Sequence, residues 1–394
     1  MMRIDHVSYN PKDKTLTVGS GATWKKIQNV LDTHGRSVKV MQSDNIFTVG
    51  GSISANVHGW QAGAPPISST INSMQIITAD GKILNISKKN EPELFKAVIG
   101  GYGQFGVILE AQLTTVANSA LNFRCEFMKP DIFAANFQEH VTKNPKVELA
   151  YGRLSVDRDH LFEEAGLFWY ETTNPISSDK ITQEGMVALK RGIFRASQYT
   201  ELGKAMRWAA ERFYAQKSAA ANPVSRNNAM NTDSHILWPL YDKNKDILHE
   251  YFIPKDKLNK FLEVTKHLIL SYDMNVLNVT IREIKQDNVS RLPYANQDVF
   301  GLVFLFSQNQ DVEAEEKMKQ FTQKVIDEVI KLQGTFYLPY RLHYNHDQLL
   351  ACYPHTGEWL KIKQKWDPDG VFSSQFFEHV QHSNNTATVK NIGF

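Results

Sequence analysis

The chain has 394 residues, enough for two or three domains with their own cores, and an ordinary globular composition. Its 44 basic and 42 acidic residues nearly balance, so the overall charge gives no electrostatic case for binding nucleic acid or an anionic membrane. The two distant cysteines, Cys125 and Cys352, exclude a disulfide framework and a thiolate metal site, and the longest apolar run, Val299–Phe306, is far too short to span a bilayer.

The first part of the chain predicts a small unit of hairpins and helices. Two alternating segments flank the turn cluster at residues 10–13, and Asp80-Gly81 is a strong two-residue hairpin sequence. The predicted strands are 3–9, 15–18, 38–41, 74–79, 82–86 and 107–116, and the predicted helices are 24–31 and 90–99.

The stretch Thr48–Gly59, TVGGSISANVHG, combines a glycine pair with small residues and a His-Gly pair. Gly50 and Gly51 leave no side chain in the way of a ligand, and Gly59 likewise lets the backbone approach one. Exposed N–H groups there can donate to a polar ligand. The alternative is a tight strand-to-helix turn packed against its own core, which the stretch taken alone favours.

A second cluster, Gly100–Gly106 or GGYGQFG, lies between a predicted helix and an apolar strand. Together the two stretches resemble the flavin-binding domain of the vanillyl-alcohol oxidase and p-cresol methylhydroxylase (PCMH-type FAD-binding) superfamily. The resemblance covers about Ile4–Val116 and returns near the C-terminus. It implies FAD as the cofactor and an α+β fold, in which a PCMH-type FAD-binding domain joins an antiparallel-sheet substrate domain with flanking helices.

No glycine-rich loop of the kind that holds the FAD pyrophosphate in this family precedes Arg3. We therefore expect residues 1–118 to form only the second lobe of the FAD-binding domain, in a chain that is truncated or has lost the first lobe. No secretion signal is visible, which predicts a cytoplasmic protein.

From residue 119 the elements follow a β-α-β-β-α order, typical of an antiparallel sheet covered by helices on one face. We expect a substrate (cap) domain at residues 119–336. Its predicted strands are 123–128, 147–156, 166–170, 248–253, 276–284 and 299–306, and its predicted helices cover 132–141, 179–221, 255–270 and 312–332.

Residues 337–394 form a C-terminal segment, which in the resembling family crosses back to the FAD-binding domain. It contains YLPY, a helix predicted from Asp347 to Lys365, and KWDPDGVFSSQFF. Alignment by motif implies FAD contacts from Thr48, Ser54, His58, Val107, Tyr337, Ser373 and Gln375. The alternative for Thr48, Ser54 and Ser373 is that their side chains only cap turns.

Two candidates for catalysis, His58 and Arg282, precede the C-terminal segment. His58 can sit beside the flavin ring or donate to a substrate oxygen, although a lone His is as often structural. Arg282, in the strand TIREIKQD, falls where alditol oxidases have a substrate-binding Arg. The position of the Glu that accompanies this Arg in alditol oxidases is occupied by Thr280 here. The alternative is therefore that Arg282 is a strand residue on the protein surface.

The third catalytic candidate, Tyr340, occupies the place of a Lys in decaprenylphosphoryl-ribose oxidases. A phenol with a lowered pKa can act as a base, and Arg341 and His343 are close enough in sequence to tune it. The alternative is a packing aromatic. Asp44 is one residue away from the catalytic Asp position of cytokinin dehydrogenases, which is Ser43 here, and this departure weakens an amine-oxidising interpretation.

The resemblance implies an FAD-dependent oxidoreductase. It would oxidise a CH–OH group of a sugar, alditol, lactone or similar polyol-like substrate by hydride transfer to flavin N5, with oxygen or another electron acceptor. Such a reaction needs a base for the hydroxyl proton and positive charge near the reduced flavin. The alternatives are oxidation of a CH–NH group, as in cytokinin dehydrogenases, and a cofactor-poor remnant or binding protein. No metal, nucleic acid or membrane span is expected.

Overall fold

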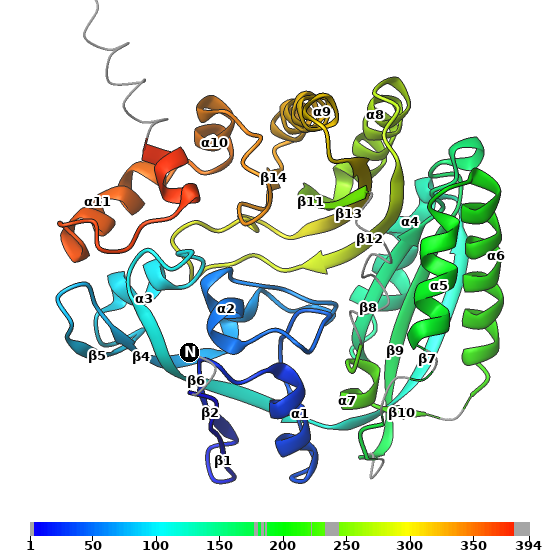
Figure 1. The fold of residues 1–394 in the computed structure, drawn as a ribbon. Helices are drawn as coiled ribbons and strands as arrows, with labels where there is room; N and C mark the ends of the chain where they lie inside the picture. The colour runs from blue at the N-terminus through cyan, green and yellow to red at the C-terminus, as the bar shows by residue number, and fades with distance from the viewer. Residues whose placement is uncertain are drawn as a thin grey trace, which may run out of the picture.

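The computed structural model describes residues 4–176, 180–182, 185, 187–221, 223–232 and 244–381. These residues form two antiparallel sheets with helices packed on them (Figure 1). The predicted α+β class is therefore confirmed.

The first sheet is built by residues 7–117 in the strand order β1-β2-β6-β4-β5, with β3 paired to β6 off this path. Both predicted hairpins are present, β1 with β2 and β4 with β5. The third strand begins and ends earlier than predicted, because residues 36–38 pair with β6 and Arg36 donates to the Thr115 carbonyl over 2.8 Å. The strands are β1 (Val7–Asn10), β2 (Thr15–Gly19), β3 (Arg36–Val38), β4 (Ile71–Ile77), β5 (Ile83–Ser87) and β6 (Val107–Ala117).

Three helices belong to this part of the chain: α1 (Trp24–Asp32), α2 (Val49–Ser54) and α3 (Pro92–Val98). Helix α1 is amphipathic and buries Trp24, Ile27 and Leu31. The Trp24 indole N–H donates to Ser52 Oγ over 2.9 Å, so α1 also fixes the position of α2.

The second sheet has the order β10-β7-β9-β8-β12-β13-β11-β14. Phe304 and Phe306 of β13 face the helical layer, where their rings lie near Phe261 of α8 and Phe321 of α9. Alternate residues of β13 therefore face the other way. The strands are β7 (Ser119–Met128), β8 (Val147–Leu154), β9 (Ala165–Ile176), β10 (Val224–Ser225), β11 (Asn244–Pro254), β12 (Val276–Ile284), β13 (Val299–Asn309) and β14 (Thr335–Phe336).

The helices of the second part follow the predicted order, with three corrections. The stretch predicted helical at 179–221 holds two helices separated by residues 198–200, and the short helix at Arg226–Ala229 was not predicted. The helix predicted from Asp347 to Lys365 is two helices, because Pro354 lacks an N–H and disfavours helical geometry at Tyr353. Some early residues of the stretch predicted helical at 179–221 lie outside the described residues. The helices are α4 (Phe133–Phe137), α5 (Val187–Ser197), α6 (Glu201–Ser218), α7 (Arg226–Ala229), α8 (Leu258–Ser271), α9 (Val312–Lys331), α10 (His346–Cys352) and α11 (Thr356–Trp366).

A single residue, Asn118, separates β6 from β7. It is buried, and its backbone N–H donates to the Gly35 carbonyl over 2.9 Å. Its side chain donates to Asp32 Oδ1 over 3.0 Å and accepts from the Asn227 N–H over 3.0 Å. The chain passes from the first sheet to the second at this residue, and the last strand of the second sheet, β14, ends at Phe336. We therefore propose domain boundaries at residues 118 and 336.

In the part of the chain that the structure describes, every helix is too short or too polar to cross a bilayer.

His249, on β11, is buried among Tyr251, Phe306 and His343. Its Nε2 has no hydrogen-bond partner among the described residues. Burial, helped by the neighbouring His343 and Arg341, lowers the pKa of His249 to about 3. The folded protein therefore keeps this imidazole neutral in mildly acidic solution.

We expect the free energy of unfolding to fall as the pH drops below about 6.5, the usual pKa of His. The unfolded chain then binds a proton at residue 249 that the folded protein does not bind, which costs about 1.4 kcal/mol of stability per pH unit. Urea unfolding at pH 7.5 and pH 5.5 measures this dependence. His249→Phe should weaken it, whereas His267→Phe, at an exposed position of α8, should not; equal pH dependence in all three proteins would contradict the assignment.

Candidate active site

The two glycine segments meet in space. The Gly100 N–H donates to the Ile53 carbonyl over 3.0 Å, and the Tyr102 N–H donates to the Ser54 carbonyl over 2.9 Å. Gly100 has φ +66°, and a Cβ there would lie 3.1 Å from Cβ of Asn56. A glycine is therefore favoured where the second segment crosses the end of α2.

The glycines of the first segment have different surroundings. A Cβ on Gly50 would lie 2.8 Å from Cβ of Ser20, and a Cβ on Gly59 would lie 2.0 Å from the Met41 carbonyl oxygen. These two glycines serve close packing within the protein, which is the alternative weighed for this stretch. Gly51 differs, because it is exposed and the nearest atom to its Cβ position is Thr48 Oγ1 at 3.4 Å.

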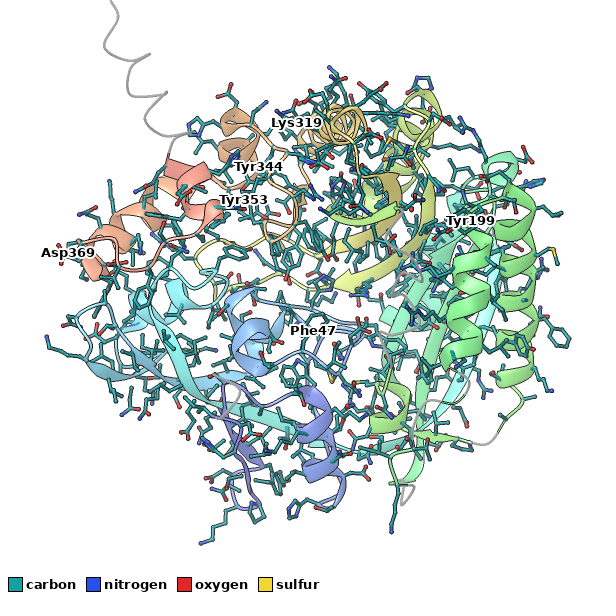
Figure 2. All side chains as sticks on the ribbon, in the orientation of Figure 1. Phe47, Tyr199, Lys319, Tyr344, Tyr353 and Asp369 are labelled. Carbon is teal, nitrogen blue, oxygen red and sulfur yellow. The ribbon has the colours of Figure 1, made fainter. Side chains whose placement is uncertain are left out.

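Exposed residues precede Gly51 in the sequence. Thr48 is half-buried and is the N-cap residue of α2, but its side chain makes no capping hydrogen bond. Ile46 and Phe47 are 37% and 48% exposed, and Figure 2 shows Phe47 at the front of the molecule, where the chain enters α2. An apolar surface edged by a hydroxyl and a bare backbone suits a flat ring system with polar edges, so these residues fit a flavin.

His58 forms a buried pair with Glu250 of β11. His58 Nε2 lies 2.6 Å from Glu250 Oε1, and Nδ1 lies 3.3 Å from the Gly59 carbonyl oxygen. Both side chains are almost inaccessible, at 4% and 3% exposure. The aromatic rings of Phe252, Tyr294 and Tyr337 surround the imidazole. The imidazole is thus fixed from both nitrogens, with a carboxylate against one of them.

The strand register places Glu250 on the same sheet face as Arg282. Val303 of β13 pairs with Glu250 on one side and with Thr280 on the other. Two residues earlier, Gly301 pairs with Arg282 of β12, and a Cβ on Gly301 would lie 3.2 Å from Glu250 Oε1. Directly paired residues project from one face of a sheet. The missing side chain at 301 therefore leaves room for the carboxylate.

Arg282 points toward the segment that leads into α2. It is half-buried, and Nη2 donates to Ser43 Oγ over 2.8 Å. Its side chain therefore lies between the second sheet and the first part of the chain, unlike the surface strand residue considered as the alternative. The resemblance to alditol oxidases left the partner carboxylate missing at Thr280. Strand β11, on the other side of β13, carries the Glu250 carboxylate at the level of Thr280.

Tyr337 and Tyr340 lie beside the His58–Glu250 pair. The Tyr337 hydroxyl donates to the Ala55 carbonyl over 2.7 Å, and its ring centroid is 5.4 Å from that of Tyr340. Tyr337 is buried and held by α2, whereas Tyr340 is half-buried and keeps part of its surface accessible. The structure thus brings His58, Arg282 and both tyrosines of YLPY into one region.

The expectation of a lowered pKa for Tyr340 was wrong. Burial and the nearby Glu250 carboxylate raise the pKa of the Tyr340 phenol, and the Arg282 guanidinium opposes this only in part. Arg341 and His343 are not the tuning residues either, since both pair with Glu315 of α9, His343 over 2.9 Å. The phenol therefore keeps its proton at neutral pH.

The predicted tail residues Ser373 and Gln375 are exposed. The residue between them, Ser374, accepts a hydrogen bond from Gln104 of the second glycine segment over 2.9 Å. Phe376 adds a ring contact with Tyr102, at 4.7 Å between centroids. The tail therefore reaches the second glycine segment next to the two predicted residues. Val107, at the start of β6, is half-buried.

Glu250 and the Arg282–Ser43 contact were missed from the sequence. The only sign of Glu250 was a carboxylate directly before the apolar end of β11, Tyr251–Pro254, where a charge is buried only if it is paired. Among the described residues there is no group of three His, Cys, Asp or Glu side chains arranged to hold a metal ion.

Residues 1–87 match the family model described as an FAD binding domain. The chain is 20% identical to decaprenylphosphoryl-β-D-ribose oxidase of Mycolicibacterium smegmatis, over 93% of this chain and 81% of that protein. It is 28% identical to the mitochondrial L-galactono-1,4-lactone dehydrogenase 2 of Oryza sativa subsp. japonica, over 35% of this chain and 24% of that protein. It is 32% identical to cytokinin dehydrogenase 1 of Arabidopsis thaliana, over 27% of this chain and 19% of that protein.

Proposed function

Because the chain belongs to the PCMH-type FAD-binding oxidase superfamily, we propose that it uses FAD to oxidise a CH–OH group of a sugar, lactone or similar polyol-like substrate. The observation that carries the proposal is the convergence of Arg282 and Tyr340 on one sheet face beside the His58–Glu250 pair. The names of two relatives, decaprenylphosphoryl-β-D-ribose oxidase and L-galactono-1,4-lactone dehydrogenase 2, contain a sugar and a sugar lactone and support a substrate of this class.

Bound FAD supplies an acceptor for the hydride that leaves the substrate carbon. Arg282 and Tyr340 are the half-buried members of the site, so their polar ends can reach a substrate, whereas His58 and Glu250 are enclosed. We assign Arg282 to orient the substrate oxygen and to stabilise negative charge on it. A fixed positive charge at this place favours a hydroxyl over a protonated amine, which supports CH–OH rather than CH–NH oxidation.

Tyr340 is the proposed acceptor of the hydroxyl proton. Since its pKa is raised, only a small fraction is phenolate at neutral pH, and that fraction grows about tenfold per pH unit. The rate of substrate oxidation should therefore rise with pH across the neutral and mildly alkaline range. His58 and Glu250 do not contact the substrate in this proposal. The Glu250 carboxylate holds the His58 imidazole in place and opposes ionisation of the Tyr340 phenol.

We expect the purified chain to bind FAD. Titration of the protein with FAD, followed by flavin absorbance and by quenching of flavin fluorescence, measures the affinity. A change in the flavin spectrum that saturates at one FAD per chain is the expected result. A folded protein that leaves the spectrum and fluorescence of added FAD unchanged would contradict the proposed function.

We expect Glu250→Gln to shift the pH profile of flavin reduction to lower pH. The amide still accepts a hydrogen bond from His58, but it removes the charge that raises the pKa of Tyr340. Each unit by which that pKa falls gives about ten times more phenolate at a given pH. Stopped-flow reduction between pH 6.5 and pH 9 measures the shift. Glu110→Gln, which removes an exposed carboxylate of β6, is the control, and a Glu250→Gln profile identical to that of wild type would remove Glu250 from this role.

A further inference from the structure

A buried carboxylate outside the site described above joins the two parts of the chain. Asp287 is 4% exposed and lies in the connection from β12 to β13, which reaches the first part of the chain beside α2 (Figure 1). Its Oδ2 accepts hydrogen bonds from Asn56 Nδ2 over 2.7 Å and from Ser290 Oγ over 2.5 Å. Its Oδ1 accepts from Ser68 Oγ and from the Val289 N–H, each over 2.9 Å. Neutral donors from both parts of the chain therefore satisfy this buried charge.

Asn56 is the contact of this carboxylate that lies nearest to the active site. Its φ is +49°, in the left-handed region that Asn adopts more readily than most residues with a side chain. The Asn56 side chain is also fixed in orientation, because its Oδ1 accepts the Ser68 N–H over 3.2 Å while its Nδ2 donates to Asp287. Asp287 thus stabilises both the side chain of Asn56 and the backbone turn that follows α2.

This turn holds two of the aromatic rings that surround His58. The Tyr337 hydroxyl donates to the Ala55 carbonyl over 2.7 Å, and the Tyr294 hydroxyl donates to the Asn56 carbonyl over 2.8 Å. The ring centroids of these two tyrosines lie 6.3 and 5.7 Å from that of the imidazole. A displacement of Asn56 would therefore move the surroundings of His58 as well as His58 itself, two residues later.

Asp287 also fixes the end of the strand that carries Arg282. It follows Arg282 by five residues. Between them, the Lys285 N–H donates to the Ala64 carbonyl over 3.1 Å. The end of β12 and the turn before His58 are thus attached to each other at this carboxylate. Because a misplacement of about 1 Å can cost about 10²-fold in rate, the relative position of these two segments affects any reaction in this site.

We propose that Asp287 is a positioning residue of the active site. Through Asn56, it holds the turn before His58 against the strand of Arg282. The hydrogen bond between His58 and Glu250, with 2.6 Å from Nε2 to Oε1, depends on this attachment. The role in catalysis rests on the proposed function, whereas the hydrogen bond forms in the protein without FAD or substrate.

Proton NMR of the full chain without FAD tests the proposal. The short hydrogen bond from His58 to Glu250 should give a far-downfield imidazole N–H resonance that His58→Gln removes. We expect Asp287→Asn to abolish this resonance or move it upfield, because two amide N–H₂ groups then face each other. Asn56→Asp should do the same, because two carboxylates then face each other. The double variant Asn56→Asp, Asp287→Asn exchanges donor and acceptor and should restore the resonance.

Asp157→Asn is the matched control. Asp157 is a buried carboxylate as well, and it caps a turn by accepting the His160 N–H over 3.0 Å. Its replacement should lower stability in urea and leave the His58 resonance in place, so the resonance distinguishes positioning from a general loss of stability.

Three results would overturn the proposal: no such resonance in wild type, an unchanged resonance in folded Asp287→Asn, or an equal change in Asp157→Asn. A double variant that fails to regain the resonance would also overturn it, and this variant alone decides if Asp287→Asn does not fold. None of these readouts needs flavin or substrate, so failure of the proposed function would leave them unchanged.

Discussion

Replacing Tyr340 with phenylalanine is expected to slow reduction of the bound flavin by about 10²–10⁴-fold, the usual loss when a general base is removed. The variant should also lose the rise of rate with pH, because the phenol whose raised pKa produces that rise is gone. The Arg282→Ala variant should behave differently. It should lower kcat/KM, because the substrate oxygen is oriented less well and its negative charge is less stabilised, while the rate of flavin reduction still rises with pH. Stopped-flow reduction over a series of pH values separates the two effects.

The matched control for Tyr340→Phe is Tyr344→Phe, four residues further along. The Tyr344 hydroxyl has no hydrogen-bond partner among the described residues, and its ring packs on Phe336 and His379 away from the site. Flavin content should stay normal in both variants. Reduction within a few-fold of wild type for Tyr340→Phe would remove it as the base and would direct attention to the His58–Glu250 pair.

Replacing Lys363 with methionine is expected to destabilise the protein by about 3–5 kcal/mol, the usual cost of leaving one member of a buried ion pair alone. Lys363 of α11 pairs with Asp367, and the two side chains are 3% and 1% exposed. Its ammonium also donates to the Gln104 carbonyl over 2.9 Å and to the Phe372 carbonyl over 2.7 Å. One side chain therefore ties the C-terminal segment to the second glycine segment.

Equilibrium urea unfolding at pH 7 measures this loss. Lys361→Met is the control, since it makes the same change at an exposed position two residues earlier in the same helix and should alter stability by less than about 0.5 kcal/mol. The double variant Lys363→Met, Asp367→Asn should recover part of the loss, because the unpaired carboxylate is then neutral. Equal stability of the two lysine variants would contradict the role assigned to Lys363.

The elements that local sequence patterns determine were predicted well. The hairpin at Asp80-Gly81 and helix α1 follow from turn chemistry and apolar periodicity within a few residues. The break between α10 and α11 was missed even though Pro354 marked it. The three-residue strand β3 was misplaced because its position depends on pairing with β6, more than 70 residues away along the chain.

The candidate site was predicted in part. The resemblance to a flavoprotein superfamily pointed to His58, Arg282 and Tyr340, and these residues do lie in one region. Glu250 was missed because its place beside Arg282 arises only when β11 and β12 flank β13. The direction of the Tyr340 pKa was wrong for the same reason: it is set by burial and by a carboxylate 90 residues earlier in the chain, and neither is a local property of YLPY.

The single residue between the sheets has a mechanical consequence. A hinge needs a few linker residues that are free to change φ and ψ, and the covalent step from β6 to β7 offers only Asn118. That residue is buried and bonded to Asp32, Gly35 and Asn227 at once. The two sheets should therefore not swing apart about this connection during turnover. A change in the relative orientation of the two sheets at this point would first have to break these hydrogen bonds of a buried side chain and backbone.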